Sequence, residues 1–173
     1  VTDLARILFK ESCIAIDTES NSRHRYPERV CLVQVATNSK VYLIDTVAVH
    51  EMDPIGDVLA DETVVKVIQG AEYDIRCLDR EWGFRVRNLF DTSIAARFVG
   101  MKQTGLSVLI EALLGVQVPK HASIQKSDWS HRPLSQEAMD YAATDVWYLL
   151  NIQKALERRL QTLARSPWVS EEC

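Results

Sequence analysis

The stretch IAIDTES, residues 14–20, follows Cys13 and carries two carboxylates, Asp17 and Glu19, directly after an apolar run. The apolar run predicts a buried central strand at 13–18. Side chains two positions apart in a strand lie on one face of a sheet, so both carboxylates are expected to project the same way. Like charges in a partly buried place repel, and a divalent cation between them removes that repulsion. The stretch alone favours a simpler alternative, in which the strand ends at Asp17 and a polar loop follows.

The rest of the chain predicts a mixed sheet between helices. Two more strands, at 30–37 and 41–45, are joined by the turn-like Asn38-Ser39-Lys40, so the first three strands form an antiparallel meander. Strands and helices then alternate, which is typical of parallel βα units. The further elements expected are strands at 64–68 and 86–90 and helices over 3–10, 54–60, 71–82 (ended by Gly83), 93–99, 105–114 and 135–163. The pattern therefore predicts an α/β fold.

Composition predicts one globular domain over residues 1–173, because the chain is 47% hydrophobic and 25% charged and no repeat or linker divides it. A net charge of −4 does not indicate a basic nucleic-acid binder, although it says nothing about local patches. No apolar stretch is long enough to span a bilayer and no signal pattern is present, so no membrane partner is expected. Because residue 1 is Val, we expect a processed product or a piece of a longer protein.

The four cysteines are far apart and form no CxxC pair, so they predict free thiols rather than disulfides or a zinc site. Free thiols favour a reducing compartment. We therefore expect an intracellular, cytoplasmic protein.

A third carboxylate, Asp145, lies on the apolar face of the long predicted helix. That face is formed by Ala138, Tyr141, Ala142, Asp145, Leu149, Ile152 and Leu156. An ionised Asp on a core-facing stripe is normally paired or bound to a metal. Tyr141 points along the same face one turn earlier, and for this residue alone a core aromatic with a satisfied hydroxyl is the favoured explanation.

A fourth carboxylate, Asp74, lies at the edge of the apolar stripe of the helix over 71–82. It belongs to the first turn of a helix that follows a strand, where sheet proteins place their ligands. The helix dipole favours an Asp there in any case, so a structural role is equally plausible for this residue alone. Asp91 is explained by helix capping, and no chemistry is assigned to it.

Asp17, Glu19, Asp74 and Asp145 together form a set of hard oxygen ligands. Such a set, without cysteine or spaced histidine ligands, suits Mg²⁺ or Mn²⁺ rather than Zn²⁺. Several carboxylates can hold two metals about 4 Å apart, which clamp the attacking and leaving oxygens of a phosphoryl displacement. The set therefore points to phosphodiester hydrolysis.

Four stretches of the sequence, from about residue 12 to about 155, resemble one enzyme family. IAIDTES, VIQGAEYDI (67–75) and YAATDV (141–146) resemble the three exonuclease motifs of the ribonuclease D group of DEDD 3′-to-5′ exonucleases, in the subclass whose third motif carries Tyr. QKSDWSHRPLS (125–135) is similar to ribonuclease D-like proteins in particular. The resemblance implies an RNase H-like core, a mixed sheet with flanking helices, and two-metal removal of nucleotides from a 3′ end.

The resemblance also implies a role for each matching residue. Asp17, Glu19 and Asp145 would hold the first metal, and Asp17 would bridge to a second metal near Asp74. Tyr141 would orient the attacking water.

At the substrate end of the site, Glu19 and the backbone around Thr18 would meet the terminal sugar. The second motif commonly has His where this chain has Gln69, followed by Gly70. We expect this departure to alter packing or substrate positioning rather than the chemistry.

Two segments could deliver a scissile phosphate to such a site. The loop SRHRYPERV (22–30) supplies Arg23, His24, Arg25, Tyr26 and Arg29, and the segment before the long helix supplies Lys120, His121, Lys126, Trp129 and Arg132. Tyr26 or Trp129 could stack on a base. The alternatives are solvated loops and, for Trp129 and Arg132, a structural role in fixing the loop against the helix.

The sequence thus predicts a metal-dependent 3′-to-5′ exonuclease of ribonuclease D type acting on single-stranded RNA, with two Mg²⁺ or Mn²⁺ ions. Two alternatives stay open. One is the same chemistry on DNA, as in Werner-type exonucleases, and the other is a non-catalytic nucleic-acid-binding or scaffolding module. The family often adds a helical nucleic-acid-binding domain after the exonuclease domain, and nothing in the sequence matches one. The sequence leaves the oligomeric state open.

Overall fold

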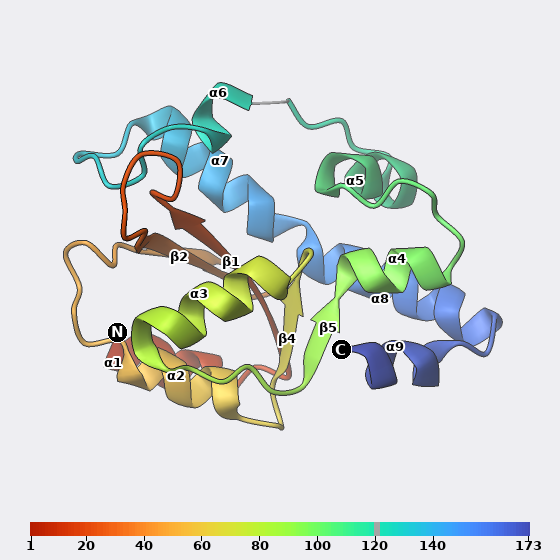
Figure 1. Ribbon diagram of the computed structural model, residues 1–173. Coiled ribbons are helices and arrows are strands. Elements are labelled where there is room, and N and C mark those ends of the chain that lie inside the picture. The colour runs from red at the N-terminus through yellow and green to blue at the C-terminus, as the bar shows by residue number, and fades with distance from the viewer. Residues whose placement is uncertain (120–121) are drawn as a thin grey trace.

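A computed structural model of the protein describes residues 1–119 and 122–173 and contains a five-stranded sheet in the order β3-β2-β1-β4-β5 (Figure 1). β1 is antiparallel to β2 and parallel to β4, β2 is antiparallel to β3, and β4 is parallel to β5. The strands are β1 (Cys13–Ser20), β2 (Val30–Ala36), β3 (Val41–Ile44), β4 (Val65–Ile68) and β5 (Leu89–Asp91). The predicted α/β fold, with a meander followed by parallel strands, is confirmed.

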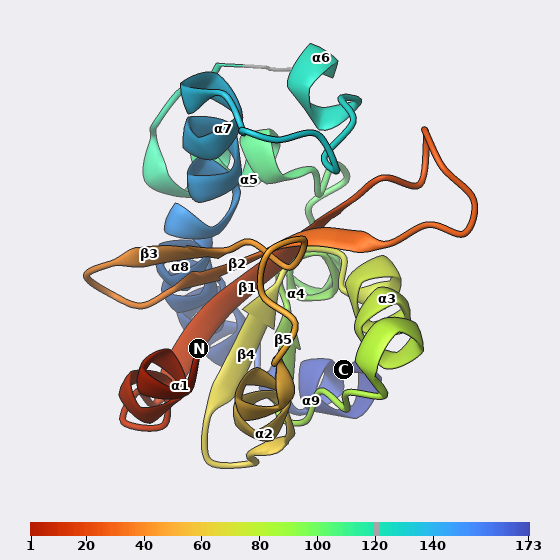
Figure 2. The same cartoon turned by 90° about the vertical axis from the view of Figure 1, so that its left-hand side faces the viewer.

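Helices cover both faces of the sheet (Figures 1 and 2). One face carries α1 (Thr2–Leu8), α2 (Asp53–Ala60) and α3 (Glu72–Trp82), and the other carries α4 (Thr92–Phe98), α5 (Leu106–Leu114), α7 (Gln136–Trp147) and α8 (Leu149–Thr162). The short α6 (Ala122–Gln125) packs on α7, and α9 (Ser166–Glu172) packs on α4, α8 and β5. β1 lies in the middle of this arrangement.

Alternate side chains of β1 face the two helical layers. Ile14 and Ile16 pack in one buried cluster with α1, α2 and α3, whereas Ala15 packs in a second cluster with α4, α5 and α8. A strand covered on both faces requires this period of two. β1 is therefore held from both sides and is a rigid base for any group that it carries.

β1 continues beyond the predicted end at residue 18. Asp17, Thr18 and Glu19 pair with Gln34, Val33 and Leu32 of β2, and the pairing becomes irregular only at Ser20. The alternative of a strand that ends at Asp17 is therefore wrong. Both carboxylates stand on the sheet itself, where pairing with β2 fixes their direction.

The predicted strand at 86–90 is shifted to Leu89–Asp91. Asn88 adopts a left-handed backbone conformation, with φ of 53°, and its side chain donates a hydrogen bond to the main-chain oxygen of Glu62. An extended strand cannot include a residue in that conformation, so pairing with β4 begins after it.

The helix predicted over 135–163 is divided at Tyr148 into α7 and α8. The two helices pack on different partners, because α7 lies across β1, β2 and β3 while α8 packs against α4, α5, β1 and β4. Two helices, α6 and α9, were not predicted from the sequence. α6 is a single turn and α9 has only seven residues, so both are too short for apolar periodicity to show.

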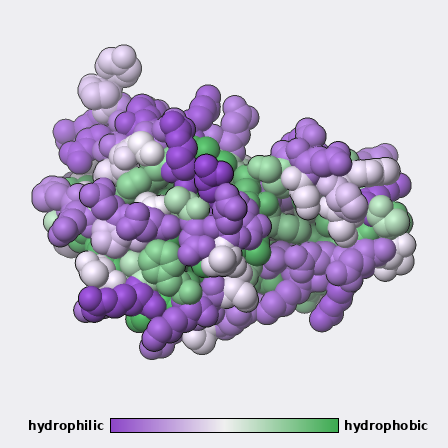
Figure 3. All heavy atoms as spheres, turned by 90° about the horizontal axis from the view of Figure 1, so that it is seen from below, coloured by the Kyte–Doolittle hydropathy of each residue, from purple (hydrophilic) through white to green (hydrophobic). Residues whose placement is uncertain are grey.

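None of the helices among the described residues has both the length and the apolar character needed to cross a bilayer. Figure 3 shows the molecule from below, where polar side chains cover most of the surface and apolar side chains show between them.

Asp91 joins two helices beside the end of β4. Its carboxylate caps α4 by accepting hydrogen bonds from the backbone N–H groups of Ser93 (2.7 Å) and Ile94 (3.3 Å), as the sequence predicts. It also accepts from the backbone N–H groups of Gly70 (3.1 Å) and Ala71 (2.7 Å), at the entry of α3. One buried side chain thus fixes the starts of both helices.

Replacement of Asp91 by Ala is expected to lower the free energy of unfolding by about 3 kcal/mol, since four backbone N–H groups lose their acceptor. Urea denaturation measures this change. Asp3→Ala removes an exposed first-turn Asp and is the matched control, with almost unchanged stability. Equal stability of the Asp91 variant and the wild type would contradict this role.

Candidate metal and catalytic site

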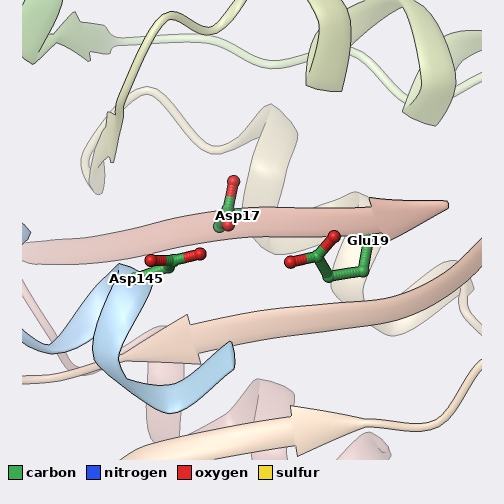
Figure 4. Close-up of side chains that lie close together, drawn as sticks. All are labelled: Asp17, Glu19 and Asp145. Atoms are coloured by element: carbon green, nitrogen blue, oxygen red, sulfur yellow. The ribbon is translucent and has the colours of Figure 1, made fainter. Parts of the chain in front are cut away.

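Three carboxyl groups converge on the face of the sheet beneath α7. Asp17 and Glu19 come from β1, and Asp145 reaches toward them from α7 (Figure 4). Each offers one oxygen, and these oxygens all lie within 4.8 Å of one another. The structure therefore brings together three of the four predicted metal ligands in a space that suits a cation.

Asp74, the fourth predicted ligand, stands in the first turn of α3, directly after β4. The side-chain hydroxyl of Thr18 donates a hydrogen bond to Asp74 Oδ1 at 2.5 Å, and both residues are buried. The side chain of Thr18 is thus engaged with Asp74, whereas the substrate contact predicted at this position is made by the backbone. This hydrogen bond fixes Asp74 at the edge of the carboxylate cluster.

A pocket of about 370 Å³ contains all four carboxylates. It is lined by Asp17, Thr18, Glu19, Ser20, Ser22, Arg23, Tyr73, Asp74, Gln125, Ser127, Tyr141 and Asp145. β4 pairs with β1 only from Cys13 to Ala15, so the pocket runs along the part of β1 that extends past β4. In open α/β sheets, ligands bind at this kind of position.

Burial and mutual repulsion make the cluster hold its protons tightly. Burial raises the pKa of Asp17 well above its usual range, and the nearby Asp74, Glu19 and Asp145 raise it further. Burial, Asp145 and Asp74 raise the pKa of Glu19 to about 9. For Asp74, burial raises the pKa to about 6, although the hydrogen bond from Thr18 lowers it. Crowded carboxylates of this kind fit a divalent cation, because its charge stabilises their ionised forms.

Tyr141 stands beside Asp145 on α7. Its pKa is raised above its usual range, first by burial and then by the negative charges of Asp145 and Glu19. The phenol therefore keeps its proton at neutral pH and cannot act there as a base. Its ring lies 6.2 Å from that of Trp129, at an interplanar angle of 37°, which holds the hydroxyl at the pocket.

The two predicted substrate-binding segments meet at the pocket. Arg23 lines it on one side, and the residues preceding and following Lys126 line it on the other. His24 Nε2 donates a hydrogen bond to the main-chain oxygen of Lys126 at 2.8 Å, which joins the segments. Arg25 and Lys126 are exposed beside them, and Tyr26 is fully exposed. Lys120 and His121 lie outside the described residues.

Sequence reasoning missed Tyr73, which lines the pocket from α3. Its hydroxyl forms a hydrogen bond with Ser20 (2.7 Å) and donates another to Glu28 (2.8 Å), and Glu28 also pairs with Arg80 of α3. These contacts tie the long β1–β2 connection to α3, and Figure 2 shows that connection reaching past the sheet beside the helix. No local pattern could reveal them, because Tyr73 is 53 residues from Ser20 in the sequence.

Trp129 does not stack on a base. Only 1% of its surface is exposed, and it packs in a buried cluster with Cys31, Leu32 and residues of α6 and α7. The structural alternative, in which Trp129 fixes the loop against the helix, is the one that the packing supports.

Arg132 is not available to a phosphate. Its guanidinium forms two hydrogen bonds with Asp45, at 2.7 and 2.6 Å, and donates to the main-chain oxygens of Trp129, His131 and Cys31. These contacts use all five N–H groups of an arginine side chain. Arg132 lowers the pKa of Asp45, which shows that the pair is a favourable one. Because Asp45 directly follows β3, the pair holds the end of that strand against the loop before α7.

Gln69, predicted to affect packing or substrate position, is bonded inside the protein. Its amide nitrogen donates to the main-chain oxygen of Thr104 at 2.7 Å, and its amide oxygen accepts from the hydroxyl of Thr92 at 2.5 Å. These bonds favour the packing role. Gly70 has φ of +65°, which glycine adopts without strain and which aims its N–H at Asp91.

A second, larger pocket of about 600 Å³ adjoins the first at Gln125, Tyr141 and Asp145. Leu106, Ile110 and Val118 give it apolar walls, and α7 supplies polar residues on the other side. The carboxylate cluster therefore stands between a polar pocket and a largely apolar one.

Comparison with known proteins gives a family match over most of the chain. The sequence profile of a family described as 3′-5′ exonuclease matches residues 1–161. Protein RRP6-like 3 of Arabidopsis thaliana is 38% identical over 163 residues, which are 94% of this chain and 18% of that protein. Ribonuclease D of Granulibacter bethesdensis is 37% identical over 171 residues, 98% of this chain and 43% of that protein. The chain thus spans less than half the length of these relatives.

Solved structures agree with the sequence matches. The catalytic core of RRP6 from Trypanosoma brucei superposes with a TM-score of 0.93 at 30% identity, over 99% of this chain and 47% of that one. Brucella melitensis NrnC with bound Mg²⁺ superposes with a TM-score of 0.82 at 26% identity, over 93% of this chain and 79% of that one.

Mg²⁺ or Mn²⁺ is expected to stabilise the protein, because a cation relieves the repulsion among the carboxylates. At about 100 times the dissociation constant, the gain is about 2.7 kcal/mol, or a rise in Tm of roughly 5 to 10 °C. Thermal melts with metal and with chelator measure it, and Asp145→Asn is expected to reduce the shift. An unchanged wild-type Tm at saturating metal would argue against a metal site.

The metal-free protein is expected to lose stability as the pH rises from about 5 to about 8. The pKa of Glu19 is about 9 in the fold against an ordinary value of 4.5, so between these values the unfolded chain has lost a proton that the folded protein retains. Each pH unit in this window then lowers the free energy of unfolding by up to about 1.4 kcal/mol.

Thermal melts in chelator across that pH range test this expectation, with Glu19→Gln as the comparison. The variant has no carboxyl group at this position to titrate, so its Tm is expected to fall less with pH. Parallel profiles for variant and wild type would show that Glu19 does not hold the proton.

Proposed function

The chain belongs to the 3′-5′ exonuclease family, and from this premise we propose that it is a metal-dependent 3′-to-5′ exonuclease of ribonuclease D type acting on single-stranded RNA. The observation that carries the proposal is the convergence of Asp17, Glu19 and Asp145 within 4.8 Å, with Asp74 in the same pocket. We propose that residues 1–173 form one catalytic domain, since all the helical layers pack on a single sheet.

Asp17, Glu19 and Asp145 would hold one divalent cation, and Asp17 and Asp74 would hold a second. Mg²⁺ or Mn²⁺ suits these oxygen ligands and, when bound, stabilises negative charge on the attacking and leaving oxygens. The protein supplies fixed ligand directions. β1 holds two of the carboxylates in one register, and Thr18 holds Asp74 through its hydroxyl.

Tyr141 would orient the attacking water. Its raised pKa keeps the phenolic proton in place, and its position beside Asp145 puts the hydroxyl at the edge of the carboxylate cluster. A neutral hydroxyl there can donate or accept a hydrogen bond without adding charge. Proton removal from the water is therefore left to other groups of the site.

The two pockets support an entry path for a 3′ end. Arg23 in the polar pocket is placed to meet a phosphate, and Arg25, Tyr26 and Lys126 lie exposed on the adjoining segments. The apolar walls of the larger pocket suit a nucleobase, and a single-stranded end can place its last base there without unpairing. Glu19 and the backbone near Thr18 would meet the terminal sugar.

All four cysteines are free thiols, which supports a reducing, intracellular and cytoplasmic setting for this enzyme. RNA in that setting is the substrate class that we propose.

The reaction is tested with 5′-labelled single-stranded RNA and DNA of equal sequence, each with Mn²⁺ and with chelator. We expect a one-nucleotide ladder on RNA that disappears in chelator. Asp145→Asn is expected to slow it at least about 100-fold, because even partners outside the ligand shell change activity by 10 to 100-fold. Asp57→Asn, an exposed change on α2, is the matched control and is expected to retain the ladder.

A ladder on DNA alone would contradict RNA as the substrate and would still support the 3′-to-5′ exonuclease reaction. No ladder on either polymer, from a protein that folds and binds Mn²⁺, would favour the non-catalytic binding module. Undiminished turnover by Asp145→Asn would overturn the site.

A further inference from the structure

Gln34 is a buried polar residue whose role the fold alone does not explain. It stands in the middle of β2 with 0% of its surface exposed. Neither its amide nitrogen nor its amide oxygen has a hydrogen-bond partner among the residues that the structure describes. Every other residue of β2 is an apolar or sulfur-containing residue, and all are buried.

An unpartnered buried amide lowers the stability of a protein, because the group loses its hydrogen bonds to water and gains none. A leucine at this position fills a similar space without that loss. The polar residue therefore works against the stability of the strand that carries it. Such conflicts between local rules and sequence are expected at functional sites.

The register of the sheet shows which groups the amide faces. Gln34 pairs directly with Asp17 on β1 and with Leu43 on β3, and directly opposed residues share one face of a sheet. Along β2, the same face carries Leu32 and Ala36. Among these four neighbours only Asp17 has an acceptor in its side chain.

We propose that Gln34 is a positioning residue for the metal site, whose amide nitrogen donates a hydrogen bond to the Asp17 carboxylate when that carboxylate binds a cation. This inference rests on the proposed function, since it requires the site to bind metal. Opposed Cβ atoms in an antiparallel pair are about 4.5 to 5.5 Å apart, so a change of side-chain rotamer is enough to form the bond.

An amide is suited to this place for a chemical reason. A donor on the far side of a ligating carboxylate fixes its orientation and favours its ionised form. Lys or Arg would do so with a positive charge, which would form an ion pair with Asp17 and compete with the metal. Gln34 offers a donor without charge, beneath the helix that brings Asp145 to the same cation.

The test replaces Gln34 by Leu and measures two quantities that need no turnover. Calorimetric titration with MnCl₂ is expected to show a dissociation constant about 10 to 100-fold higher than that of the wild type. In chelator, the Tm of the variant is expected to rise by about 3 °C, because the unpartnered amide is gone. Weaker metal binding by a more stable protein is a result that a purely structural role would not give.

Gln153 provides a matched control in α8. It is buried as well, but its amide is satisfied, since it accepts from the thiol of Cys13 (3.1 Å) and donates to Glu157 (3.0 Å). Gln153→Leu is expected to lower the Tm and to leave the Mn²⁺ dissociation constant unchanged.

Gln34→Met is a second variant, which tests whether altered packing by the branched leucine causes the effect. Methionine is unbranched, has a similar length and lacks a donor, so this variant is expected to weaken Mn²⁺ binding equally. Wild-type affinity in either folded variant would overturn the inference, whatever its Tm. A wild-type protein that binds no Mn²⁺ would instead overturn the proposed function, so the two failures are distinguishable.

Discussion

The crowding of four carboxyl groups in one pocket is the constraint on which the rest of this structure depends. Burial raises the pKa values of Asp17, Glu19 and Asp74, and the charges of Asp74 and Asp145 raise those of Asp17 and Glu19 further. A loop with four such groups would relax by moving them apart. Here two of them stand on a central strand paired with β2, and the other two stand on helices packed against the sheet, so the groups stay close together and keep protons unless a cation binds.

The sheet brings these groups together from both of its faces. Asp17 and Glu19 point toward α7, which supplies Asp145, while Thr18 between them is bonded to Asp74 of α3. The site lies where β1 extends past β4, so side chains from both faces of the sheet reach the same pocket. Asp91 secures the entry of α3 at this point through the backbone of Gly70 and Ala71. Stability and function thus share the same few hydrogen bonds.

Sequence reasoning found the carboxylates because each interrupts an apolar pattern, and the patterns themselves predicted most of the strands and helices. It misjudged Trp129 and Arg132, since a basic and aromatic loop resembles a binding surface until its partners are known. The five hydrogen bonds of Arg132 and the burial of Trp129 depend on segments far away in the chain. The break at Tyr148 was hidden for the same reason, because apolar periodicity continues through it while the packing partners change.

Gln34 shows why a polar residue inside an apolar strand deserves a physical explanation. In the β2 sequence VCLVQVA, Gln34 is the one amide among buried apolar and sulfur-containing residues. Only the strand register places it opposite Asp17. Two unfavourable features then coincide, an amide without a partner and a carboxylate with a raised pKa. Each is a loss for the metal-free fold, and one hydrogen bond to an ionised Asp17 would give the amide nitrogen a partner and stabilise the carboxylate. Because both features occur at one position, the polar residue in the middle of β2 is better explained by the metal-bound state of the site, in which Asp17 is ionised, than by the stability of the sheet.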